Sequence, residues 1–249
     1  MTARVKTETV KTETGGAVTD SPRRWEPAEL APFIQHTRID VGVTRDEIIA
    51  HARECLRYGF NAAMVPGSWV PVVAAELAGT GVEVASALDF PTVGVTSSAG
   101  KAAEAAELVR LGATQLDIGV QIGWLKSGMF DEFREDIAGV VRAAGVPVKV
   151  MLELPLLSDA EREAAVELSM DAGAAYLKNA SAGSVEIANP ASIRYLVERA
   201  RDGVRVKASG GIKSYPQAVG LLEAGAVLLG TSAGIAIVTD SGDERTVSY

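Results

Sequence analysis

Short apolar runs and longer helical stretches alternate along most of the chain. Each β-branched or apolar run, typical of a buried strand, is followed by a segment rich in Ala, Leu and Glu at helical spacing. The predicted strands are 34–39, 62–66, 82–90, 115–122, 146–154, 175–180, 204–209 and 227–231. The predicted helices begin near Thr44, Val70, Ser97, Asp131, Ser158, Asn189 and Tyr215, with a short additional helix near Ser232.

The residues between these elements support the same alternation. Thr44 and Glu47 have the spacing of a capping box that opens a helix, as do Ser158 and Glu161. A Leu/Ala-Gly-Ala triplet occurs just before three of the predicted strands, at 111–113, 172–174 and 224–226. Reuse of one helix-to-strand joint indicates repeated β/α units.

Eight strands, each followed by a helix, predict a parallel sheet. Eight such units within about 215 residues match an α/β fold of the closed (β/α)₈ or TIM-barrel type, as a single domain over 25–239. The alternative is an open, doubly wound sheet, but no Gly-x-Gly-x-x-Gly follows the first predicted strand. We expect 1–24, which contains a tandem VKTET repeat, to be a disordered N-terminal tail and 240–249 to be a mobile C-terminal tail.

Composition narrows the class of protein. The chain has 24 basic and 32 acidic side chains and a net charge of −8, which argues against nucleic acid or an anionic membrane as a partner. It contains neither the ~20 apolar residues of a membrane span nor an apolar signal-peptide core, so we expect a cytoplasmic protein. One cysteine and two histidines argue against an intrachain disulfide and against a multi-cysteine or His-rich metal site. We therefore expect no metal and no cofactor.

Charged residues interrupt strands that should be wholly apolar in a parallel sheet. The two-residue period of a strand points Asp117 inward from the fourth predicted strand, and Lys149 and Glu153 inward from the fifth. Lys178 and Lys207 point inward from the sixth and seventh. Buried charges are costly unless paired. The group is therefore either an ion-pair network that sets the barrel's register or a site of chemistry.

Two lysines on adjacent strands favour chemistry, because they repel each other and stability gains nothing from that repulsion. An ordinary lysine has a pKa near ~10.4 and is almost fully protonated at neutral pH. A neighbouring cation and burial lower that pKa, and the neutral amine can then attack a carbonyl to form a Schiff base. A carboxylate such as Asp117 can relay the protons that this reaction requires.

Glycine-rich segments follow the last two predicted strands. They read Ser-Gly-Gly at 209–211 and Gly-Thr-Ser at 230–232. In barrel enzymes these two loops often hold a phosphate through backbone N–H groups. The sequence therefore predicts a phosphate site at this end of the barrel.

At these residues the chain resembles the deoxyribose-phosphate aldolase family, metal-independent class I aldolases on a (β/α)₈ barrel. The resemblance runs from about Phe33 to Val238, most of the predicted barrel. Its most specific segments are VKASGGIK at 206–213, QLD at 115–117, VKV at 148–150, LKN at 177–179, FP at 90–91, HT at 36–37 and GTS at 230–232.

The resemblance implies a role for each polar residue. Lys178 would be the Schiff-base lysine, and Lys207 the cation that lowers its pKa. Asp117 would relay protons, and Lys149 would support Asp117. The implied phosphate-binding residues are Gly210, Gly211, Lys213, Gly230, Thr231 and Ser232.

The resemblance also implies the reaction. A class I aldolase of this family would reversibly cleave a deoxysugar phosphate, splitting 2-deoxyribose 5-phosphate into acetaldehyde and glyceraldehyde 3-phosphate, or would act on a related specialised substrate. The partner would be a small-molecule aldehyde or sugar phosphate, while a homo-oligomer is left open. Some members end in a tyrosine that reaches the site, and this chain ends in Tyr249.

The chain departs from the family in residues that read the substrate. Segment 179–182 reads Asn-Ala-Ser-Ala where the family usually has Thr-Ser-Thr-Gly, and Gln35 stands where an aspartate is usual. Gln121 and Ala233 also differ from the usual residues. Two other function classes are left open. One is a phosphate-binding barrel isomerase without a covalent lysine, and the other is a non-catalytic aldolase-like barrel used as a binding subunit.

Overall fold

The computed structural model describes residues 25–241, and within them eight parallel strands close into a barrel. The strands pair in chain order from β1 to β8, and β8 returns to β1 with Gly230 opposite Gln35. This closure confirms the predicted (β/α)₈ barrel, and the open doubly wound alternative is wrong. The strands are β1 (Ile34–Thr37), β2 (Ala62–Met64), β3 (Glu83–Leu88), β4 (Gln115–Gly119), β5 (Val148–Met151), β6 (Tyr176–Lys178), β7 (Arg205–Ser209) and β8 (Leu228–Thr231).

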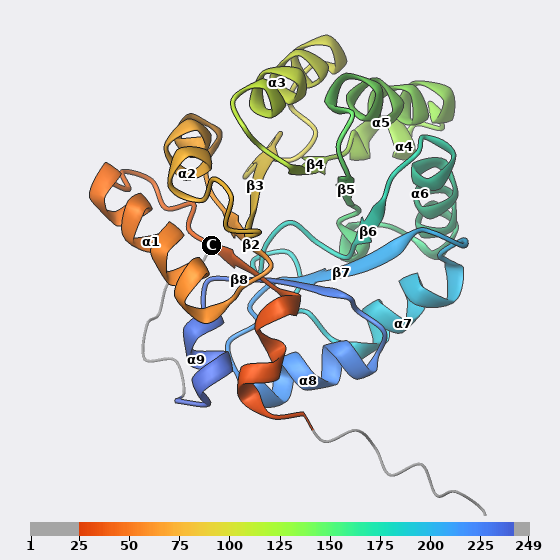
Figure 1. Ribbon diagram of the computed structural model, residues 1–249. Coiled ribbons are helices and arrows are strands. Elements are labelled where there is room, and N and C mark those ends of the chain that lie inside the picture. The colour runs from red at the N-terminus through yellow and green to blue at the C-terminus, as the bar shows by residue number, and fades with distance from the viewer. Residues whose placement is uncertain (1–24, 242–249) are drawn as a thin grey trace, which may run out of the picture.

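The helices form an outer ring around the strands (Figure 1). They are α1 (Arg45–Tyr58), α2 (Val70–Glu76), α3 (Ser98–Arg110), α4 (Ile122–Lys126), α5 (Phe130–Ala144), α6 (Asp159–Asp171), α7 (Pro190–Arg199), α8 (Tyr215–Glu223) and α9 (Gly234–Thr239). Three short 3₁₀ helices complete the list for the described residues: η1 (Pro27–Phe33), η2 (Gly67–Trp69) and η3 (Leu154–Leu156). Both predicted capping boxes are confirmed, at Thr44 and at Ser158.

The strands end earlier than their apolar runs predicted. The run 115–122 leaves the sheet after Gly119, because Ile122 begins α4, a helix that the sequence pattern did not reveal. The run 146–154 leaves the sheet after Met151, and Glu153 adopts a left-handed conformation with φ 53°. Glu153 therefore does not continue the inner face of the barrel as predicted. Its Oε1 instead accepts a hydrogen bond of 2.9 Å from the Ser181 backbone N–H.

The main apolar core lies between the barrel and its helices. Leu116 and Ile118 of β4 and Val148 and Val150 of β5 are buried there, as the two-residue period predicted. A second, smaller apolar cluster comprises Ala62, Met64 and Ala85 of β2 and β3.

Within residues 25–241 the structure has no helix that is both long and apolar enough to cross a membrane. The predicted N-terminal tail lies outside the described residues. Most of the predicted C-terminal tail, including Tyr249, also lies outside them.

Candidate active site

A pocket of about 590 Å³ opens at the carboxyl ends of the strands. This end of a (β/α)₈ barrel is where active sites lie. Apolar side chains, hydroxyls, glycines and charged groups share its wall. The lining residues are Thr37, Ile39, Met64, Ala87, Phe90, Asp117, Met151, Lys178, Ser181, Ala182, Gly183, Lys207, Ser209, Gly210, Ile212, Gly230, Thr231 and Ser232.

Sheet register brings the four predicted charged side chains together inside the barrel. Asp117 lies opposite Lys149 across β4 and β5, and Lys178 lies opposite Lys207 across β6 and β7. Asp117 Oδ2 accepts hydrogen bonds from Lys178 Nζ at 2.9 Å and from Lys207 Nζ at 2.7 Å. Lys149 Nζ lies 3.3 Å from Asp117 Oδ1. Three amines therefore share one carboxylate, a group that we call the Asp117 cluster.

The members of the Asp117 cluster differ in their access to the pocket. Lys178 and Lys207 line it, and Lys178 is the more exposed of the two, at 5% against 1%. Lys149 is fully buried, does not line the pocket, and has the Tyr176 ring centroid 5.6 Å from its Nζ. Lys149 can therefore act on a substrate only through Asp117.

The electrostatics of the Asp117 cluster are set by burial and by the excess of amines. Burial alone would raise the pKa of Asp117, but Lys178, Lys207 and Lys149 hold it well below its usual value. Burial holds the pKa of Lys207 well below its usual value, and the other two lysines act in the same direction while Asp117 opposes them. Burial likewise lowers the pKa of Lys149. The site thus keeps an ionised carboxylate next to the amines of Lys207 and Lys149, which lose their protons more readily than an ordinary lysine.

Lys207 has a second partner that sequence reasoning did not find. Its Nζ donates to Gln35 Oε1 at 2.6 Å. Gln35 Nε2 in turn donates to Gln115 Oε1 at 2.7 Å and to Asn61 Oδ1 at 3.0 Å. The available signal was the inward position of Gln35 on the first strand, but its partner is known only once the barrel closes.

The predicted phosphate-binding residues are only partly brought together. Gly210, Gly230, Thr231 and Ser232 line the pocket, whereas Gly211 and Lys213 do not. Lys213 is exposed, and its backbone N–H donates to Gln217 Oε1 at 3.0 Å. The Thr231 hydroxyl donates to the carbonyl of Ile212 at 2.6 Å, so its proton already stabilises the neighbouring loop.

Two of the pocket glycines are required by close approaches. Gly210 has φ +116°, and a Cβ there would collide with the carbonyl oxygen of Glu186. A Cβ on Gly230 would lie only 3.0 Å from Lys207 Cε. Gly230 therefore leaves space for the Lys207 side chain as well as lining the pocket.

The segment after Lys178 forms part of the pocket wall. Ser181, Ala182 and Gly183 line it. Asn179 ties this segment to the end of β7, because its Nδ2 donates to the Ser209 carbonyl at 3.0 Å and its Oδ1 accepts from the Ser209 N–H at 2.9 Å. Its Nδ2 also contacts Glu186 Oε2 at 2.7 Å. Asn179 therefore supports the pocket wall without lining the pocket itself.

A second buried lysine group lies beside the pocket, and sequence reasoning missed it. Lys101 Nζ contacts Asp136 Oδ2 at 2.6 Å, the Gly119 carbonyl at 2.9 Å and Asp89 Oδ2 at 3.4 Å. Asp89 also accepts backbone hydrogen bonds from residues 94–96. This arrangement, the Lys101 cluster, holds the loop that carries Phe90 into the pocket wall.

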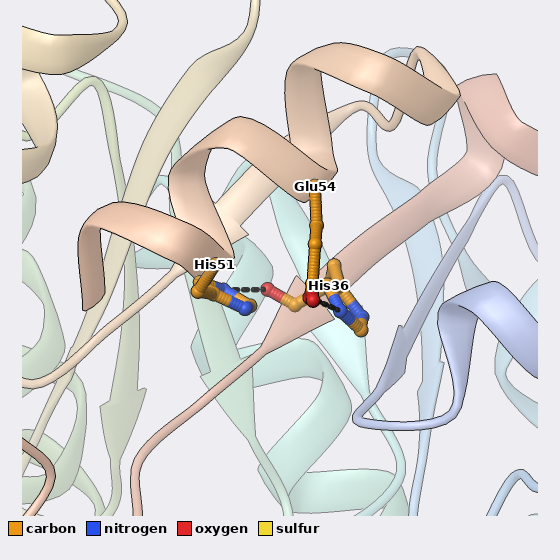
Figure 2. A group of neighbouring side chains, drawn as sticks. All are labelled: His36, His51 and Glu54. Atoms are coloured by element: carbon orange, nitrogen blue, oxygen red, sulfur yellow. Dashed lines mark hydrogen bonds and ion pairs between the residues drawn. The ribbon is translucent and has the colours of Figure 1, made fainter. Parts of the chain in front are cut away.

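The two histidines come together on the side of β1 that packs against α1 (Figure 2). His36 Nε2 lies 3.4 Å from Glu54 Oε2, and His51 Nε2 hydrogen bonds to the His36 carbonyl at 3.1 Å. Burial lowers the pKa of His51 to about 3, so its ring is neutral. These three side chains could in principle ligate an ion, but none lines the pocket. The expectation that no metal serves the reaction stays a prediction.

Comparison with known proteins assigns the family. No family model matches the chain. It is 41% identical over 211 residues to the deoxyribose-phosphate aldolase of Methanothermobacter thermautotrophicus, covering 84% of this chain and 94% of that protein. It is also 41% identical over 204 residues to that of Thermosynechococcus vestitus, covering 82% and 93%.

A solved structure agrees with these relatives. The tetrameric deoxyribose phosphate aldolase of Aeropyrum pernix superimposes with a TM-score of 0.78 at 29% identity, covering 87% of this chain and 92% of that one. The resemblance noted in the sequence is thereby confirmed over nearly the whole barrel. The chain belongs to the deoxyribose-phosphate aldolase family, a family of lyases.

Proposed function

We propose that this protein is a class I aldolase that reversibly cleaves 2-deoxyribose 5-phosphate into acetaldehyde and glyceraldehyde 3-phosphate through a Schiff base on Lys178. The observation that carries the proposal is a pocket-lining lysine within a buried group of three amines and one carboxylate. Membership of the deoxyribose-phosphate aldolase family supports the choice of substrate.

The geometry favours Lys178 over the other two lysines as the nucleophile. Lys149 does not line the pocket, and the Lys207 amine is occupied by hydrogen bonds to Asp117 and Gln35. Lys178 lines the pocket and is the most exposed of the three. A substrate carbonyl can therefore approach its Nζ most easily.

The bond changes follow from the chemistry of an amine and an aldehyde. The neutral Lys178 amine attacks C1 of the open-chain sugar, and the carbonyl oxygen leaves as water to form an iminium ion. As the C3 hydroxyl loses its proton, the C2–C3 bond breaks and its electron pair moves toward the iminium nitrogen. Glyceraldehyde 3-phosphate departs and leaves an enamine. Protonation at C2 and hydrolysis then release acetaldehyde and restore the lysine.

Asp117 supports these steps from its position between the amines. Its carboxylate orients Lys178 and Lys207 through Oδ2. The neighbouring lysines hold the pKa of Asp117 low. Its carboxylate therefore binds a proton only transiently and relays it between neighbouring groups. The substrate phosphate binds between the loops after β7 and β8, where Gly210, Gly230 and Ser232 line the pocket.

Reductive trapping tests the proposal. The protein is incubated with 2-deoxyribose 5-phosphate, reduced with sodium borohydride and mapped by peptide mass spectrometry. We expect the adduct on Lys178, with Lys101, a buried lysine outside the pocket wall, as an unlabelled internal control. The Lys178→Met variant is the matched negative control. Turnover of the substrate with no adduct, or with an adduct only elsewhere, would contradict the proposal and favour an isomerase. The absence of both turnover and an adduct would contradict it as well and favour a binding subunit.

We further propose that the chain assembles as a homo-oligomer. The support is the tetrameric relative from Aeropyrum pernix. Size-exclusion chromatography with light scattering measures the mass directly. A mass near that of one chain, 26.0 kDa, at micromolar concentration would contradict this proposal.

A further inference from the structure

The partner of Lys207 on the first strand is an amide. Gln35 is fully buried, and its Oε1 accepts the hydrogen bond from Lys207 Nζ at 2.6 Å. Lys207 therefore lies between a carboxylate on β4 and a neutral carbonyl on β1. Hydrogen bonds therefore hold the Lys207 amine from two sides, but of the two partners only Asp117 carries a negative charge.

The orientation of the Gln35 amide is determined by its contact with Lys207, and its other contacts fit that orientation. Both hydrogens of its Nε2 point to acceptors, Oε1 of Gln115 and Oδ1 of Asn61. A flipped amide would place its N–H groups against the Lys207 ammonium, which can only donate. The hydrogen-bond network thus allows one orientation, with the carbonyl toward Lys207.

The charges that face Lys207 come from several strands. Asp117 faces it from β4, Lys149 from β5 and Lys178 from β6, while β8 contributes the backbone of Gly230 and β1 contributes Gln35. With an amide on β1, the group has three amines and one carboxylate. With a carboxylate on β1, it would have three amines and two carboxylates, and Lys207 would keep its proton more firmly.

We propose that Gln35 is a positioning residue for the aldol reaction, which orients Lys207 against Asp117 without adding a second negative charge to the site. This inference rests on the proposed function. It goes beyond that function by assigning the protonation balance of the site to one neutral side chain. Gln35 itself does not line the pocket, so it acts through Lys207.

The charge-adding variant Gln35→Glu tests the inference, because it changes the charge at nearly constant size. The amides of Gln115 and Asn61 can turn to present their N–H groups to the new carboxylate. We expect the acidic limb of the pH–rate profile to move up by about one pH unit, with the rate at pH 7 falling about tenfold and recovering at higher pH. The readout is kcat/KM for 2-deoxyribose 5-phosphate from pH 5 to 10.

The matched control is Gln35→Met, which removes the hydrogen bond without adding a charge. Its rate should fall without a shift of the profile and should not recover at high pH. If Gln35→Glu does not fold, Gln35→Asp and Gln35→Asn form a second pair that differs only in charge. The inference is supported if the acidic limb of the pH–rate profile lies at higher pH in Gln35→Asp than in Gln35→Asn.

Two results would overturn it. One is the same pH–rate profile in Gln35→Glu as in Gln35→Met, and in Gln35→Asp as in Gln35→Asn, while borohydride still traps Lys178 in the wild type. That outcome rejects the role of Gln35 and leaves the proposed function intact. The other is the absence of a Lys178 adduct in the wild type, which rejects the proposed function and this inference together.

Discussion

The barrel contains two buried lysine groups that are built in opposite ways. The Lys101 cluster surrounds one amine with the carboxylates of Asp136 and Asp89 and with a backbone carbonyl. The Asp117 cluster surrounds one carboxylate with three amines. The Lys101 cluster lies beside the pocket, where its three side chains form no part of the wall, whereas Asp117, Lys178 and Lys207 form part of it.

The ratio of amines to carboxylates in the two clusters distinguishes a structural ion pair from a reactive one. In the Lys101 cluster the amine is matched by acceptors, so removing the amine leaves acidic groups buried without their cation. In the Asp117 cluster two amines exceed the available negative charge, and stability gains nothing from adding like charges. Such an excess is useful only where an amine must give up its proton. The sign of the imbalance, rather than burial alone, distinguishes the two groups.

The largest effect is expected from Lys178→Met. Activity on 2-deoxyribose 5-phosphate should fall by on the order of a thousandfold or more, as when a covalent nucleophile is removed. The fold should survive, because Asp117 keeps Lys207 and Lys149 as partners. Turnover numbers and melting temperature are measured on the same preparation. Retained turnover would show that the amine of Lys178 is not the nucleophile.

Lys101→Met should act on stability. It leaves Asp136 and Asp89 buried without their shared cation, and the free energy of unfolding should fall by about 3–5 kcal/mol. Urea unfolding gives this value, with Lys178→Met as the matched buried lysine that should change it far less. Equal losses of unfolding free energy in the two variants would show that the two clusters do not differ in their contribution to stability.

Lys207→Met should affect the pH dependence of the rate. The variant removes one positive charge beside Asp117 and Lys178, so the rate at pH 7 should fall tenfold or more, by roughly 1.4 kcal/mol, and recover partly as pH rises. Asp117 retains Lys178 and Lys149, so the cost in stability should be limited to the unpaired Gln35 carbonyl, about 1–3 kcal/mol.

The pH–rate profile and the melting temperature of Lys207→Met are measured together. An unshifted profile with a large drop in melting temperature would mean that Lys207 serves the fold, as Lys101 does. An alkaline shift with a nearly normal melting temperature would place it with the reactive group.

The smallest effect is expected from Lys213→Ala. This lysine was a predicted phosphate ligand, but its side chain is exposed and does not line the pocket. KM for the phosphorylated sugar should change by less than about twofold, since exposed charges interact weakly with groups at a distance. Ser232→Ala, which alters a residue of the pocket wall, is the comparison variant. A tenfold rise in KM for Lys213→Ala would restore its predicted role.

Local patterns in the sequence were sufficient for the architecture and for the central charges. The alternation of strand and helix segments placed all eight strands within a few residues of their observed positions. The two-residue period placed Asp117, Lys149, Lys178 and Lys207 on the inner faces, because neighbouring side chains on a strand point to opposite sides. Both conclusions depend only on residues close together in the chain.

Contacts between distant segments were decided only by the tertiary structure. Lys207 and Gln35 are 172 residues apart, and they meet because β8 pairs with β1 to close the barrel. Lys101 and Asp136 meet because α3 packs against α5. The same holds for the loop residues: Gly210 reaches the pocket wall and Lys213 does not. Strand register and helix packing set these distances, and neither is encoded in the spacing of residues along one segment.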